Sequence, residues 1–149
     1  MNLTRFTDYS LRVLLYVATQ SDNRLANIQE IATVYGISNH HLVKIVHKLG
    51  NLGLLETVRG RHGGIRLAIR PEDINVGWVV RQTEENWNIV ECFDEENGFC
   101  ILNPACRLKN ILAKALQAYL AELDHYTLAD LIINRETLQE LLSSGIKES

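Results

Sequence analysis

The pattern of apolar and polar positions predicts a largely helical N-terminal half. Apolar residues recur every three or four positions over about 2–19, 27–35 and 39–51, so each stretch predicts an amphipathic helix. Asn27 and Ser38 can cap the second and third helices. Gly36 lies between them and can adopt the positive φ angle that a tight turn needs. A helix-turn-helix is therefore expected over about residues 27–51.

The period then changes from helical to two residues, which indicates β-strands. Two strands are expected at about 54–59 and 65–70, and the Gly-rich, cationic segment Arg59–Gly64 forms the tip between them. A helix-turn-helix followed by such a hairpin predicts a winged helix-turn-helix DNA-binding domain over residues 1–80, closed by a short helix at about 73–81. The expected fold class is mainly α with a small β-hairpin wing and a long dimerisation helix.

A long amphipathic helix is expected from Pro104 to about Asp124, about 20 residues and roughly 30 Å in length. Its broad apolar stripe has little remaining chain to pack against, so pairing with the same helix of a second copy is the simplest way to bury it. The residues expected at that contact are Leu108, Ile111, Leu112, Ala115, Tyr119 and Leu123. Residues 105–132 are assigned to this helix and a short successor capped by Thr127, and residues 133–149 to a tail with a short helix and a frayed end.

The net charge of −3 combines two halves of opposite sign. Residues 1–70 carry nine Lys and Arg against four Asp and Glu, and residues 71–149 carry six against fourteen. A basic front half indicates a polyanionic partner, and a winged helix fits double-stranded DNA. The residues expected to contact DNA are Ser38, Asn39, His40, His41, Lys44, Lys48, Arg59, Arg61, His62, Gly63 and Gly64. An ordinary helical hairpin with a solvated face does not explain the arginines at the tip.

All three cysteines, Cys92, Cys100 and Cys106, lie in the segment 81–106. Three thiols on one loop before a helix can converge on one point, which favours a metal or iron–sulfur site over three unrelated apolar residues. Their gaps are wider than the close cysteine pairs of zinc sites, although a DNA-binding protein with structural zinc stays open. Iron–sulfur clusters usually take four thiolates, so a fourth ligand must come from a distant residue, a partner chain or a small molecule.

Several other classes of protein fit poorly. No apolar run approaches about 18 residues, and the start of the chain does not resemble a secretory signal, so no membrane span is expected. The odd number of cysteines then favours the reducing cytoplasm. A thiol enzyme would need a close C-x-x-C pair or a histidine near the thiols, and neither is present, so no enzymatic activity is expected.

Three motifs together resemble the Rrf-two type winged-helix regulators. They are Leu3-Thr4-x-Phe6-Thr7-Asp8-Tyr9-x-Leu11-Arg12, Val58-Arg59-Gly60-x-x-Gly63-Gly64-Ile65-Arg66-Leu67 and Cys106-Arg107-Leu108. The resemblance covers about residues 1–132 and is strongest to the nitric-oxide-sensing repressors within the family. It implies a homodimer with one 4Fe-4S cluster per subunit, held by the three cysteines and by Asp8 of the partner subunit. In such regulators the cluster-loaded dimer binds operator DNA, and nitric oxide nitrosylates the cluster and releases the DNA.

Other branches of the same family are alternatives. The cluster-biogenesis regulators use a histidine three residues after the last cysteine, where this chain has Lys109. Iron- or redox-responsive regulators have a similar cysteine loop, and the acidic run from Glu91 to Glu96 leaves them open. A 2Fe-2S cluster is the alternative to a 4Fe-4S cluster.

Overall fold

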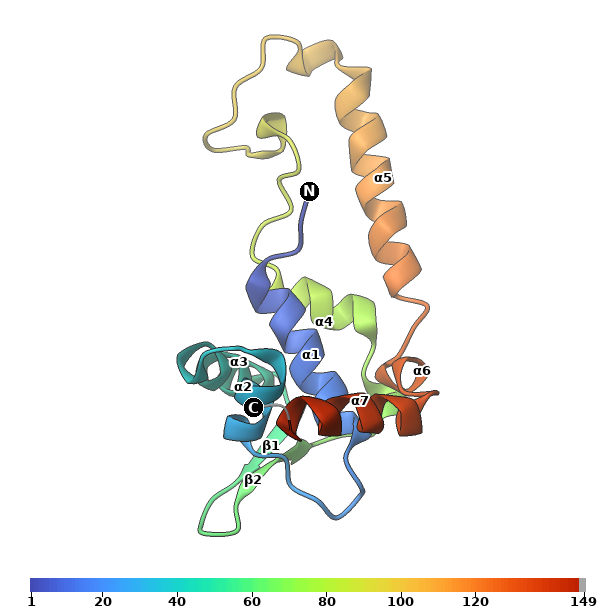
Figure 1. Cartoon of the computed structure of the whole chain (residues 1–149). Helices are drawn as coiled ribbons and strands as arrows, with labels where there is room; N and C mark the ends of the chain where they lie inside the picture. Colours follow the sequence, from blue (N-terminus) through green and yellow to red (C-terminus); the bar gives the residue numbers. More distant parts are fainter. Residues whose placement is uncertain (148–149) are drawn as a thin grey trace.

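The computed structural model describes residues 1–147 and has two visibly different parts. Figure 1 shows a compact group of helices with a two-stranded hairpin at one end, and a long helix and an irregular loop extending from it. The compact part contains α1 (Arg5–Thr19), α2 (Ile28–Tyr35), α3 (Asn39–Asn51), β1 (Leu55–Val58) and β2 (Gly64–Leu67). The expected class, mainly α with a small β-hairpin, is confirmed.

Helix α1 is the centre of the compact part. Val13, Leu14 and Tyr16 are at most 1% exposed, and α3 and β2 pack on the same helix. Helix α3 contributes Leu42, Ile45, Val46 and Leu49 to this core, at the spacing that keeps one helical face inward. Burial of this one continuous apolar face per helix explains why the sequence pattern located all three helices.

The two helices of the helix-turn-helix begin at the capping residues that the sequence predicts. The side chain of Asn27 accepts a hydrogen bond from the backbone of Gln29, and that of Ser38 accepts one from His41. Gly36 has a φ of 63°, in the left-handed region that favours glycine. The sharp turn therefore rests on a glycine at the one position that needs it.

The wing is an antiparallel pair in which Leu55 lies opposite Leu67 and Val58 opposite Gly64. Both strands are shorter than the alternating pattern predicts. Ala68, just after β2, still donates to the backbone oxygen of Leu54, and the chain then leads into a 3-10 turn at Pro71–Asp73. Ala26, just before α2, pairs with Ile65 in an isolated bridge. The wing is thereby attached to the helix-turn-helix.

Helix α4 (Val76–Thr83) contacts both α1 and α5, and so lies where the extended part joins the compact part. Helix α5 (Arg107–Leu123) is 17 residues long and begins three residues after Pro104, because Asn103–Ala105 form a separate 3-10 turn. Asp124, at the end of α5, forms an ion pair with Arg81 of α4, and its backbone oxygen accepts from Asn75 at 2.7 Å. These bonds fix the end of α5 to α4.

The C-terminal segment is more ordered than the expected tail. After α6 (Leu128–Leu131), α7 (Arg135–Lys147) is 13 residues long and packs on α2 and α1. Arg135 donates to the backbone oxygens of Thr19 and Gln20 at the end of α1. This anchoring explains a longer helix than the sequence predicts. Of the expected tail at 133–149, residues 148–149 lie outside the described residues. No helix in residues 1–147 has the length and apolar character needed to cross a membrane.

Candidate functional site

The residues predicted for DNA contact on α3 share one exposed surface. Ser38, Asn39, His40, His41, Lys44 and Lys48 are all exposed, while the opposite face of the helix is buried. Helix α3 contains no Asp or Glu. The helix therefore presents a polar and cationic face to solvent, as a recognition helix requires.

Asn39 is oriented by a neighbour that the sequence did not single out. Its side-chain amide donates to Oε1 of Gln29 at 2.8 Å, from the first turn of α2. The two helices of the motif thus share a side-chain bond at the exposed start of α3. Glutamine at this position has no distinctive pattern, so only the three-dimensional arrangement reveals the contact.

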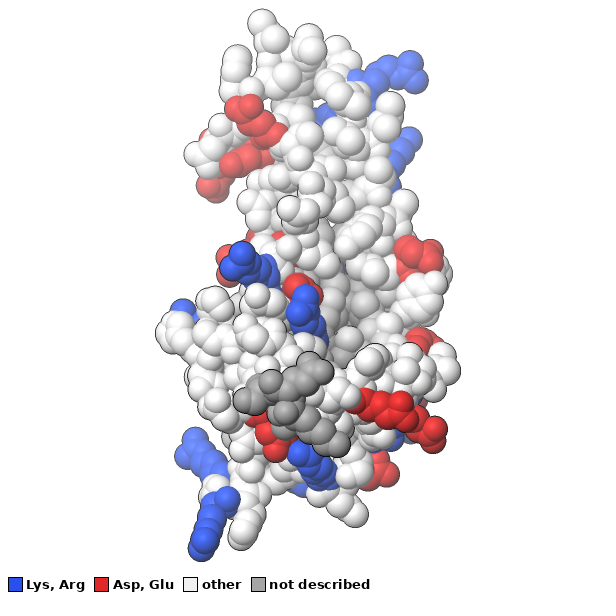
Figure 2. Space-filling model, in the orientation of Figure 1, with Lys and Arg blue, Asp and Glu red and all other residues white. Residues whose placement is uncertain are grey.

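The wing tip carries exposed basic side chains. Arg59, Arg61 and His62 are exposed, and Figure 2 shows cationic side chains projecting beyond the body at the wing. Within residues 1–147, no carboxylate pairs with Arg59 or Arg61, whereas Arg66 on β2 is paired with Glu56 at 3.1 Å. The same hydrogen bond raises the pKa of Arg66 and lowers that of Glu56. The unpaired charges are available to a polyanion.

The wing glycines have a folding role that the sequence did not predict. A Cβ at Gly63 would lie 2.2 Å from the carbonyl oxygen of Val58, and one at Gly64 would lie 2.5 Å from that of Ala26. The two glycines are therefore needed so that the backbone at these positions can lie close to the backbone of Val58 and Ala26. Their proposed proximity to DNA stays a prediction.

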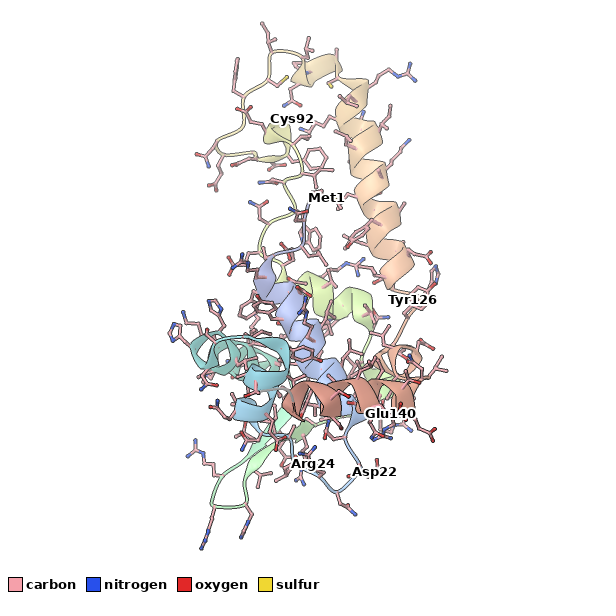
Figure 3. The ribbon with its side chains drawn as sticks, in the orientation of Figure 1. Met1, Asp22, Arg24, Cys92, Tyr126 and Glu140 are labelled. Carbon is pink, nitrogen blue, oxygen red and sulfur yellow. The ribbon has the colours of Figure 1, made fainter. Side chains whose placement is uncertain are left out.

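The three cysteines lie on the extended loop, far from the helix-turn-helix. Figure 3 shows the labelled Cys92 at the end of the molecule opposite Arg24 and Glu140. Cys92, Cys100 and Cys106 are free thiols of intermediate exposure. Cys92 lies in a 3-10 turn, Cys106 is the residue before α5, and Cys100 lies between them.

The chemistry of these three side chains suits an iron–sulfur cluster, but the side chains are not close together in this structure. Three unpaired thiols are the donors that iron–sulfur clusters take. The described part of the chain nevertheless holds no group of three His, Cys, Asp or Glu side chains close enough together to bind one metal ion. The donor set fits a cluster, and binding one would require the loop to close.

Asp8 is engaged within its own helix. Its two carboxylate oxygens accept from Nε and Nη2 of Arg12, each at 3.0 Å. The Arg12 guanidinium also lies 5.9 Å from the ring centre of Tyr35, and the Tyr35 hydroxyl donates to the Arg12 backbone oxygen. Burial raises the pKa of Tyr35 to about 12. Asp8 is thereby connected to the helix-turn-helix through Arg12.

The residues predicted for dimerisation form an uncovered face on α5. None of the 17 residues of this helix is buried. Leu108 is 61% and Ile111 58% exposed, Ala115 is exposed, and Leu112, Tyr119 and Leu123 are partly exposed. A single chain therefore leaves this stripe in contact with water.

Comparison with known proteins identifies the family. A family model described as "Rrf2: Iron-dependent Transcriptional regulator" matches residues 3–134. The chain belongs to the Rrf2 family. Two relatives, both named HTH-type transcriptional regulator NsrR, are 56% identical in Halalkalibacterium halodurans and 55% identical in Bacillus subtilis, and each alignment covers 95% of this chain and 97% of the relative. The predicted resemblance is confirmed.

Solved Rrf2-type structures have the same fold. CymR of B. subtilis, titled the global cysteine regulator, has a TM-score of 0.70 and 27% identity, covering 88% of this chain and 95% of that chain. IscR of T. potens has a TM-score of 0.71 and 25% identity, covering 93% and 91%. The chain is therefore a DNA-binding transcriptional regulator, and the expectation that it is not an enzyme is confirmed by its relatives.

Proposed function

We propose that the protein is a homodimeric transcriptional repressor whose cysteine loop holds a 4Fe-4S cluster and makes operator binding sensitive to nitric oxide. The observation that carries this proposal is three free thiols on one loop of a winged-helix regulator. The NsrR relatives and the family's description as iron-dependent support it. Because it acts on operator DNA, the protein works in the cytoplasm.

The uncovered face of α5 supports a dimer. An apolar stripe along 17 residues, about 25 Å of helix, is long enough for a paired helical contact. Two chains related by a two-fold axis would cover each other's stripe and carry two recognition helices, as paired DNA half-sites require.

The shape of the chain favours a ligand shared between subunits. Figure 1 shows the cysteine loop at the far end of α5 from α6, and α1 lies lower, against the compact part. If the two α5 helices pair in opposite directions, the loop of one chain approaches the α1 helix of the other. Asp8 of the partner subunit would then complete the ligand set with Cys92, Cys100 and Cys106, once its ion pair with Arg12 opens.

The bound cluster would supply iron atoms that react with nitric oxide. The chain's own residues would hold the cluster and link the loop to the rest of the protein. Holding the cluster would bring Cys92, Cys100 and Cys106 together and so close the loop. The ion pair between Asp124 and Arg81 links the end of α5 to α4. The three thiols can be reached from solvent, since each cysteine is partly exposed.

An iron- or redox-responsive regulator is the second candidate, and the family description favours it. This candidate would use the same cysteines and DNA-contacting residues, and it differs only in the signal that it senses. A 2Fe-2S cluster is the alternative cofactor. A structural zinc ion is a third possibility that the same measurement addresses.

The test is anaerobic purification of the full chain, followed by iron, sulfide and zinc analysis. Its operator is selected from random duplex DNA, and binding is measured before and after nitric oxide, iron chelation or oxidant. Four irons and four sulfides per chain, with release by nitric oxide alone, are expected. Zinc without sulfide, or equal operator affinity with and without the cluster, refutes the proposal. Release by chelation or oxidant alone identifies the second candidate.

A further inference from the structure

Glu84 is a buried acidic residue that the proposed DNA and cluster sites do not use. It immediately follows α4 and is 9% exposed. Its carboxylate accepts from the backbone nitrogen of Thr4 at 3.0 Å, from the Thr4 hydroxyl at 3.1 Å and from the Thr7 hydroxyl at 2.5 Å. Thr7 is fully buried. The carboxylate is therefore held by three donors from a segment about 80 residues away in sequence.

These donors belong to the start of α1. Thr4 is the N-cap of that helix, and its own hydroxyl accepts from the Thr7 backbone. The start of a helix leaves backbone N–H groups without helical partners and carries a partial positive charge. A carboxylate from outside the helix satisfies both requirements, so Glu84 acts as a second, long-range cap on α1.

Glu84 is also the first residue of the segment that leads to the cysteines. The residues around it, Asn86, Trp87 and Ile89, form a cavity of about 310 Å³ with Met1 and Leu3, and Tyr119 of α5 also lines it. The chain before α1 therefore lies between the base of the loop and α5. Figure 3 shows Met1 on the body side of Cys92, in agreement with this arrangement. A movement of the loop base would act directly on the start of α1.

Helix α1 in turn contacts the recognition helix. The ring of Tyr9 lies 6.4 Å from that of His41, which is exposed near the start of α3, and α1 shares the core with α3. Tyr9 is two residues from Thr7, within the same first turns of α1. One short path therefore runs from the loop base through Glu84 and α1 to the surface predicted to read DNA.

We propose that Glu84 is a positioning residue that couples the cysteine loop to the recognition helix by fixing the start of α1. This inference rests on the proposed function, because the state of the loop is set there by the cluster. Removing the carboxylate separates the loop from α1. Operator affinity then no longer depends on the state of the loop, although the cluster itself still forms.

The measured quantity is the ratio of operator affinities of cluster-loaded and cluster-free dimers. Couplings between sites are typically about 5- to 150-fold, so the wild-type ratio is expected in that range. In Glu84→Ala the ratio is expected to fall to within about twofold of one, with iron and sulfide content and the visible absorption spectrum unchanged. Glu84→Gln keeps the length and one acceptor oxygen, so it is expected to restore part of the ratio.

Glu85→Ala is the matched control, because it removes the same side chain from the next, exposed position and should keep the wild-type ratio. Thr7→Val removes the shortest of the three bonds with little change of shape. If Glu84→Ala does not fold, the affinity ratio is measured in Thr7→Val instead, where it is likewise expected to fall. Equal loss of affinity in both states, with the ratio kept, would show a purely structural residue and overturn the inference. An altered spectrum in Glu84→Ala would instead make it a cluster ligand and also overturn it. A ratio of one in the wild type would refute the proposed function itself.

Discussion

The charge at the wing tip gives a prediction with a defined magnitude. Arg61 is exposed and has no carboxylate partner within residues 1–147, so its charge is available to a DNA phosphate. Each phosphate contact contributes about −0.9 to the slope of log affinity against log salt concentration. A dimer places one Arg61 at each half-site, so Arg61→Ala is expected to make the slope less steep by about 1.8.

The consequence is a defect that depends on salt. Between about 50 and 200 mM salt, a slope difference of 1.8 changes the affinity ratio of wild type to variant by about twelvefold. Arg61→Ala should therefore bind much more weakly than wild type at low salt and approach it at high salt. Fluorescence anisotropy with a labelled operator, over at least four salt concentrations, measures this directly.

Two controls make the result decisive. Lys114→Ala removes the same charge from an exposed position on α5 and should leave the slope unchanged. The double variant Glu56→Ala/Arg66→Ala removes the neighbouring ion pair without changing the net charge, and should also leave it unchanged. If Arg61→Ala has the wild-type slope, or if Lys114→Ala changes the slope as much, the wing tip is not at the phosphates.

Three further variants test the other parts of the structure. Ile111→Asp places a charge on the uncovered face of α5, and sedimentation should show a folded monomer; a dimer of unchanged affinity would argue against this face. Gln29→Ala removes the 2.8 Å bond that orients Asn39, and operator affinity should fall about two- to tenfold in the same anisotropy assay, the usual effect of one hydrogen bond. Gly77→Ala would place its Cβ 2.0 Å from the Asp124 carboxylate, so thermal unfolding should occur at lower temperature, and adding Asp124→Ala should recover part of the loss; an unchanged melting temperature in Gly77→Ala would contradict this geometry.

Much of the fold was accessible from the sequence because it depends on local patterns. The buried residues of α3 recur with helical spacing, and Asn27, Gly36 and Ser38 each perform the local task that their residue type predicts. The apolar stripe of α5 was equally readable, since a helix without a partner in its own chain keeps its pattern uninterrupted. Periodicity and capping are properties of neighbours in sequence, so they need no knowledge of tertiary contacts.

The contacts that join distant segments were not accessible in this way. Glu84 looks like one more acid before an acidic loop, and only the fold brings it to Thr4 and Thr7. Helix α7 was expected to be shorter because its stability comes from packing on α2 and α1, which no local pattern records. The role of the wing glycines was missed for the same reason, because the atoms that exclude a side chain at Gly64 belong to Ala26.

Those distant contacts converge on the two ends of α1. A carboxylate from Glu84 caps the start of the helix, and the guanidinium of Arg135 donates to the backbone oxygens at its end, so each charge complements the helix dipole there. A helix fixed at both ends by different segments cannot tilt without straining one of them. The core that α1 shares with α3 then transmits such a tilt to the exposed face of the recognition helix. Control of operator binding can therefore be exerted at a loop that touches neither the recognition helix nor the wing, provided that the loop moves the start of α1.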